Sequence, residues 1–132
     1  MGRLFDAAAS LLFGFDVHSF EAEASMQLEN RASQYYYNHP SSQINSYLEG
    51  VIPENIFTYL TEKVITDLYN KSDRNLMAAR FHVSLVDYIV KVANKSGLTQ
   101  IAFSGGVFQN ALILDIIQEK MKNNFTLYFQ QE

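Results

Sequence analysis

The residues best suited to chemistry form one glycine-rich segment, Ser104-Gly-Gly-Val-Phe-Gln-Asn110. It follows a short apolar run over 100–103 and precedes an apolar-periodic run over 111–117, an order typical of a strand, a turn and a helix. Adjacent Gly105 and Gly106 let the backbone approach a ligand closely and take a positive φ. Unpaired N–H groups at the start of a helix favour an anion. A phosphate is therefore the expected ligand, although the spacing alone favours a tight turn that binds no ligand.

Two polar side chains could complete such a site. Asn110, in the first turn after the glycines, either caps the helix locally or donates amide hydrogen bonds to a ligand beside the phosphate. Asp6 lies off the most apolar face of an N-terminal helix. It is either a solvated acid or a carboxylate that accepts a hydrogen bond from a ribose hydroxyl. Spacing leaves both pairs of alternatives open, and it identifies no catalytic residue.

The histidines do not form a metal-binding pattern. His18, His39 and His82 are far apart, and no two of them have the i, i+4 spacing of a helical metal site. His82 falls on a strongly apolar helix, which favours a buried, hydrogen-bonded ring over a metal ligand. We predict no metal site built from this chain alone.

The aromatic and acidic clusters favour ordinary packing. Tyr35–Tyr37 and Tyr128–Phe129 could stack on bases, but they are better explained as core and rim because no basic residues are interleaved with them. The acids Glu21, Glu23 and Glu29 are predicted to lie on a solvated helix face.

Composition limits the classes of protein to consider. The 132 residues predict one domain, and 48% hydrophobic with 18% charged residues is an ordinary globular balance. A net charge of −4 without a Lys/Arg cluster argues against nucleic acid as a partner. No apolar run is long enough to span a bilayer, and no secretory signal is evident. With no cysteine in the chain, a cytoplasmic protein is expected.

Apolar periodicity predicts mostly helices, followed by a β-α-β unit. The expected elements are helices over residues 3–13, about 20–37, 53–69 and 73–94, a short strand around Tyr47, a strand over 99–103, a helix over 108–122 and a strand over 125–129. A right-handed crossover makes the last two strands parallel and puts the glycine turn at the carboxyl end of the first. The predicted fold class is a helix-rich α/β fold with a small parallel sheet.

A sheet of two strands is marginal by itself. We therefore expect the chain to be part of a larger α/β protein that supplies further strands. The uncovered edge and apolar face of such a sheet predict self-association, through the 125–129 strand or a largely apolar helix.

Four motifs in order resemble the carboxyl-terminal part of the HypF carbamoyltransferase family. They are Met1-Gly-Arg-Leu-Phe-Asp-Ala-Ala-Ala-Ser-Leu-Leu-Phe-Gly14, Ser19-Phe-Glu-Ala-Glu-Ala24, Ala78-Ala-Arg-Phe-His82 and the glycine segment 104–110. The resemblance implies that residues 1–132 are the carboxyl-terminal fragment of a TsaD-like carbamoyltransferase domain. It also implies a partial ASKHA fold, the actin/Hsp70-like and RNase H-like superfamily that includes the threonylcarbamoyl and O-carbamoyl transferases.

The resemblance also implies a function and a site. In that family, carbamoyl phosphate and ATP give carbamoyl-adenylate. The carbamoyl group then passes to the carboxyl-terminal cysteine of HypE, on the way to the cyanide ligand of nickel–iron hydrogenase. The resemblance assigns Gly105 and Gly106 to the nucleotide phosphate, Asn110 to the nucleotide and Asp6 to the ribose.

Departures from the family pattern narrow this expectation. This chain has Phe20-Glu21-Ala22 where family members usually have Tyr-Glu-Gly, so it lacks the glycine that a close backbone contact would need there. The family's metal-binding histidines and aspartate, for Zn or Fe, are expected before and after this chain. We therefore expect half a nucleotide site and no carbamoyl transfer by the chain alone. The alternatives are a threonylcarbamoyl or O-carbamoyl transferase segment, or a non-catalytic helical interaction module.

Overall fold

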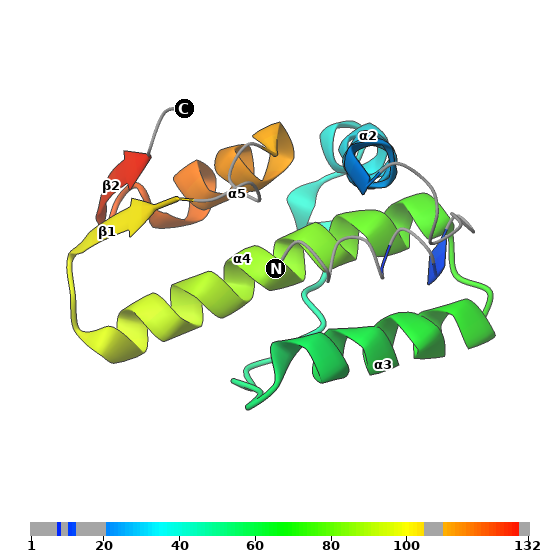
Figure 1. Ribbon diagram of the computed structural model, residues 1–132, viewed down its shortest axis with the longest axis horizontal. Coiled ribbons are helices and arrows are strands. Elements are labelled where there is room, and N and C mark those ends of the chain that lie inside the picture. The colour runs from blue at the N-terminus through cyan, green and yellow to red at the C-terminus, as the bar shows by residue number, and fades with distance from the viewer. Residues whose placement is uncertain (1–7, 9–10, 13–20, 105–109, 130–132) are drawn as a thin grey trace.

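A computed structural model describes residues 8, 11–12, 21–104 and 110–129, and only the backbone for 21–25 (Figure 1). Its elements in chain order are α2 (Glu21–Asn38), the 3-10 helix η1 (Ser41–Gln43), α3 (Ile56–Tyr69), α4 (Arg74–Ser96), β1 (Gln100–Phe103), α5 (Ala111–Met121) and β2 (Thr126–Phe129). This order confirms the predicted helix-rich α/β fold. Of the helix predicted over 3–13, residues 8, 11 and 12 are described, and they are helical.

Helix α4 is the central element (Figure 1). Helices α2, α3 and α5 all contact it. The side chain of Asp73 caps its start by accepting from the N–H groups of Asn75 and Leu76, and Gly97 ends it in the left-handed region, at φ 74°. Because neighbours surround it, α4 buries residues on most of its faces. They are Met77, Ala78, Ala79, Phe81, His82, Val83, Ser84, Leu85, Val86 and Ala93.

The predicted strand around Tyr47 is wrong. The segment between α2 and α3 holds η1 and an irregular loop instead. The backbone N–H of Tyr47 donates to Ser84 Oγ of α4 at 2.7 Å, and its hydroxyl donates to Asp67 of α3 at 2.6 Å. The backbone carbonyl of Tyr47 accepts from the hydroxyl of Tyr59 of α3 at 3.0 Å, so two helices supply the partners of the backbone groups that a neighbouring strand would otherwise satisfy.

Helix α3 begins later than predicted. Its N-cap is Asn55, whose side chain accepts from the N–H of Thr58 at 3.1 Å. Pro53 therefore lies before the helix, and not in its first turn. An asparagine oxygen satisfies an N–H group of the first turn, and this bond fixes the boundary more firmly than the permissive φ of proline.

The two described strands are parallel, as predicted. β1 pairs with β2 in the register Gln100↔Thr126 to Phe103↔Phe129. The rings of Phe103 and Phe129 stack with their centroids 5.2 Å apart. Helix α5 makes the crossover between the strands and packs on α4. The residues that α5 buries are Leu112, Ile113, Ile116, Ile117 and Met121.

Strand β1 and helix α5 flank the glycine segment that the sequence marks for ligand binding, and α5 packs on α4.

Candidate functional site

The glycine turn is described at its two ends, Ser104 and Asn110. Gly105 and Gly106 lie outside the described residues, and so does Asp6. Their assigned contacts with the nucleotide remain predictions. Of the four predicted site residues, Asn110 is therefore the one whose surroundings the structure gives.

Asn110 is the N-cap of α5. Its backbone is extended, at φ −70° and ψ 113°, and its Oδ1 accepts from the N–H of Ile113 at 3.0 Å. Capping is one of the two roles that the sequence leaves open for this residue. The amide nitrogen has a different partner, because Nδ2 lies 3.0 Å from Nε2 of His82 on α4.

His82 is a fully buried polar residue, as predicted. Its Nδ1 lies 2.8 Å from the carbonyl oxygen of Ala78, and this contact requires a proton on Nδ1. An amide nitrogen can only donate, so Nε2 must accept from Asn110. One neutral tautomer, protonated on Nδ1, satisfies both contacts.

The charge state of the ring agrees with this tautomer. Burial lowers the pKa of His82 to about 4 from 6.5, and the hydrogen bond to Ala78 opposes part of this shift. The imidazole is therefore neutral at neutral pH. Its Nε2 then remains an acceptor for Asn110.

Glu29 of α2 lies beside the start of α5, and the prediction of a solvated face is wrong for it. Burial raises the pKa of Glu29, and a backbone hydrogen bond with Ala111 lowers it in part. A carboxylate at this position complements the positive end of the α5 dipole. The signal missed in the sequence is tertiary, because Glu29 and Ala111 are far apart along the chain. The side chains of Glu21 and Glu23 lie outside what the structure describes.

Two tyrosines attach α2 to the far part of α5. The hydroxyl of Tyr36 donates to Glu119 at 2.6 Å, and that of Tyr37 donates to Asp115. Burial and the hydrogen bond to Glu119 raise the pKa of Tyr36, which keeps this hydroxyl protonated as a donor. Tyr35 and Tyr36 also pack against the core. The predicted packing at the rim is confirmed for Tyr35 and Tyr36, whereas Tyr37 is exposed.

Arg80 and His82, two residues apart in the motif 78–82, point in different directions from α4. Arg80 binds Asp67 of α3 at 2.8 Å and the carbonyl oxygen of Asn45 at 3.0 Å. Its guanidinium lies 4.0 Å from the centre of the Tyr47 ring. The arginine thus holds the loop after α2, while the histidine holds the start of α5.

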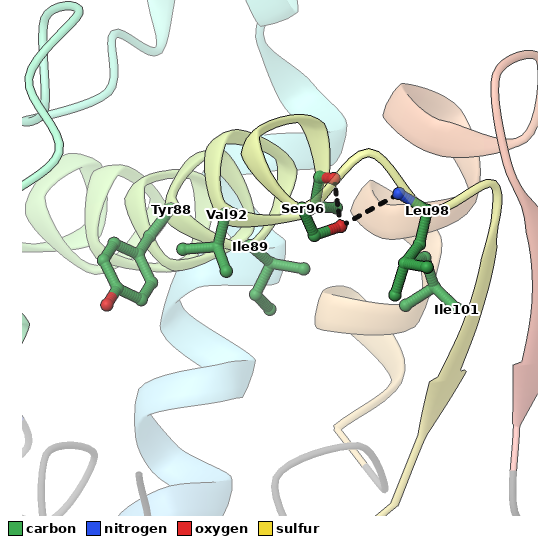
Figure 2. A pocket seen from close by; sticks show the side chains of 7 residues that line it. Tyr88, Ile89, Val92, Ser96, Leu98 and Ile101 are labelled. Carbon is green, nitrogen blue, oxygen red and sulfur yellow. Dashed lines mark hydrogen bonds between the residues drawn. The ribbon is translucent and has the colours of Figure 1, made fainter.

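An open apolar depression lies between the C-terminal half of α4 and β1 (Figure 2). Its volume is about 300 Å³, and it is lined by Tyr88, Ile89, Val92, Ala93, Ser96, Leu98 and Ile101. The Ser96 hydroxyl donates to the carbonyl of Ala93 and accepts from the N–H of Leu98. A depression with this lining does not suit a phosphate.

Within the described part of the chain, no three His, Cys, Asp or Glu side chains are grouped so that they could hold a metal ion. The described helices also include none that is long and apolar enough to cross a membrane.

Comparison with known proteins defines the class. All 132 residues match the family described as carbamoyltransferase, Kae1-like domain, second subdomain. The chain is 33% identical over 119 residues to carbamoyltransferase HypF of Synechocystis sp., a match that covers 86% of this chain and 14% of that protein. It is 28% identical over 137 residues to the probable carbamoyltransferase HypF of Methanocaldococcus jannaschii, covering 98% of this chain and 17% of that protein.

The chain therefore belongs to the HypF carbamoyltransferase family, and the resemblance seen in its motifs is confirmed. It spans about one sixth or less of the length of these two relatives.

The buried imidazole predicts a specific pH dependence of stability. Because burial lowers the pKa of His82 from its ordinary 6.5 to about 4 in the folded chain, the unfolded chain binds more protons between these two pH values. The stability that the neutral, buried ring of His82 adds to the folded state is fully present above pH 6.5, and it is lost as the pH falls towards 4. From about pH 7 to about pH 4.5, wild type should lose about 2 kcal/mol more of its free energy of unfolding than His82→Gln. Urea denaturation measures this difference, and equal losses in both proteins would contradict it.

Asn110→Asp should raise the pKa of His82. The carboxylate keeps an oxygen for the N–H of Ile113 but puts a second oxygen, an acceptor, where Nδ2 now donates to Nε2. The ring must take a second proton to restore a hydrogen bond, and the negative charge favours this proton. Titration of the ring protons by NMR should show a midpoint well above that of wild type. An unchanged midpoint would show that the two side chains do not share a hydrogen bond.

Proposed function

We propose that residues 1–132 form the carboxyl-terminal part of a TsaD-like carbamoyltransferase domain and supply half of its nucleotide site. In the proposed reaction, the carbamoyl group of a carbamoyl-adenylate, made from carbamoyl phosphate and ATP, passes to the terminal cysteine of a HypE-like acceptor protein. The thiolate attacks the carbamoyl carbon, and AMP departs. The product is the precursor of the cyanide ligand of nickel–iron hydrogenase.

The observation that carries the proposal is family membership over the whole chain together with the position of Asn110. The family match covers residues 1–132. Asn110 lies at the carboxyl end of the glycine turn, between the end of β1 and the start of α5. In open α/β sheets, ligands bind at the carboxyl ends of the parallel strands. The turn after β1 therefore lies at the edge of the sheet where a nucleotide is expected.

The donors at the start of α5 indicate how a nucleotide would fit. Asn110 Oδ1 accepts from the N–H of Ile113. Interaction with the backbone of Ala111 lowers the pKa of Glu29, and the negative charge of this carboxylate disfavours a second anion at the start of α5. We assign the phosphate to the backbone of Gly105 and Gly106 instead.

Asn110 has a further donor for the nucleoside side. An amide group carries two hydrogens on nitrogen, and His82 accepts one of them. The second is the hydrogen that we assign to the nucleotide. Asp6 is assigned to the ribose hydroxyls, for which a carboxylate is a strong acceptor. We assign the metal ion of the whole enzyme, Zn or Fe, to ligands outside this chain.

A threonylcarbamoyl or O-carbamoyl transferase would use the same half of the nucleotide site that we assign to this chain. The motifs Gly2-Arg-Leu-Phe-Asp6 and Arg80-Phe-His82 favour the HypF reaction over these alternatives. Assays of the whole protein with each acceptor would separate the three reactions. Product formation on a cysteine-terminated HypE peptide is the expected result.

Substitutions at the predicted contacts should weaken nucleotide binding. Loss of the charged acceptor in Asp6→Ala should cost about 1.5–3 kcal/mol, roughly ten- to a hundredfold in affinity. Gly106→Val puts a branched side chain where the phosphate must approach the backbone. Calorimetric titration of ATP, or of a carbamoyl-adenylate analogue, into the protein at its natural length measures both effects.

Two controls make this titration decisive. Each variant must unfold at a temperature close to that of wild type, because Gly106 could matter only for the turn. Glu62→Ala, at an exposed position on α3, should bind as wild type does. Equal affinity in wild type, Asp6→Ala and Gly106→Val would mean that the glycine segment is only a turn and that the helical interaction module is the better interpretation.

A further inference from the structure

His82 is the fully buried histidine of α4, and its ring lies against the N-cap of α5. We propose that His82 is a positioning residue of the nucleotide site: its ring fixes the orientation of the Asn110 amide, and with it the hydrogen that Asn110 presents to the nucleotide. This inference rests on the proposed nucleotide site and adds a residue that acts there without touching the ligand.

The two hydrogen bonds of Asn110 select one orientation of its amide. Oδ1 faces a donor, the N–H of Ile113, at 3.0 Å, and Nδ2 faces an acceptor, Nε2 of His82, also at 3.0 Å. Rotating the amide by half a turn would put its NH₂ against the N–H of Ile113 and its oxygen against Nε2. Both contacts would then be repulsive, so the observed orientation is the one that satisfies each group.

The ring itself is held in place. Nδ1 donates to the carbonyl oxygen of Ala78, one turn earlier on α4, at 2.8 Å. The ring of Phe81 lies edge-on to it, with centroids 6.0 Å apart. The side chain is fully buried. A ring that is packed and hydrogen-bonded at Nδ1 presents its Nε2 acceptor in one direction, toward Asn110.

Asparagine, and not aspartate, at position 110 fits a role beyond capping the helix. Aspartate caps a helix start about as well as asparagine, and its charge also suits the helix dipole. Aspartate would, however, present an oxygen to Nε2 and could offer no hydrogen to a ligand. The amide is planar, so its two hydrogens have a fixed relation to each other. Fixing one of them on His82 therefore fixes the other for the nucleotide.

A double-mutant cycle on nucleotide affinity tests this inference. The proteins, at natural length, are wild type, His82→Leu, Asn110→Ala and the double variant, titrated with ATP by calorimetry. Leucine roughly keeps the side-chain volume but removes the Nε2 acceptor. We expect about tenfold weaker binding in His82→Leu, since the amide loses its partner and its single orientation. In the Asn110→Ala background, the same change should alter affinity by less than about twofold, because the residue through which His82 acts is gone.

Two further variants separate positioning from general packing. His82→Gln puts an amide oxygen near the position of Nε2, so it should accept from Asn110 and restore affinity to within about threefold of wild type. His39→Leu is the matched control. His39 also has its Nδ1 close to the carbonyl oxygen four residues earlier, that of Tyr35 at 2.9 Å, but it is exposed. This variant should bind ATP as wild type does.

Each outcome decides one claim. If Asn110→Ala weakens binding and His82→Leu does not, or if the two effects simply add, the positioning role is wrong and the nucleotide site stands. If wild type binds ATP and Asn110→Ala binds equally well, the assignment of Asn110 to the nucleotide fails, and the role of His82 fails with it. If wild type does not bind ATP, the proposed function itself is wrong. Thermal unfolding of every variant identifies any loss of affinity that follows from unfolding.

Discussion

The hydrogen bond between His82 Nε2 and Asn110 Nδ2 joins the central helix to the start of α5. Burying an imidazole and an amide is costly unless each has a partner. Among the described residues, every buried side-chain nitrogen and oxygen atom has one. Moving the start of α5 away from α4 would break this bond, so the bond helps to fix where α5 begins. Helix α5 then crosses to β2, which pairs with β1 in parallel.

The second support of the turn is α2. Glu29 reaches the backbone of Ala111, and two turns further along, the hydroxyl of Tyr36 binds Glu119. These contacts hold α5 against α2. The start of α5 is thereby positioned by two helices that are distant in sequence. In a transferase this rigidity is useful, because groups that are already oriented lose no freedom when the substrate binds.

Local signals predicted the boundaries that depend on local chemistry. The helix predicted over 73–94 is found at Arg74–Ser96, because the N-cap oxygen of Asp73 and the left-handed Gly97 act within one turn of its ends. The strand at Tyr47 was wrong because the partners of this residue, Ser84 and Asp67, come from two other helices. The position of Glu29 escaped prediction for the same reason. The glycine turn could be located by its sequence, but whether Asn110 caps, binds a ligand or does both depends on His82, which is 28 residues away.

The central claim is that a neutral His82, protonated on Nδ1, holds Asn110 at the end of the glycine turn. The most direct measurement is a long-range ¹H–¹⁵N NMR correlation of the histidine rings at neutral pH, with His82 assigned from the spectrum of His82→Gln. The account predicts one protonated nitrogen, Nδ1, and an unprotonated Nε2 that shows coupling across the hydrogen bond to Asn110 Nδ2. A ring protonated on Nε2, or on both nitrogens, would contradict it.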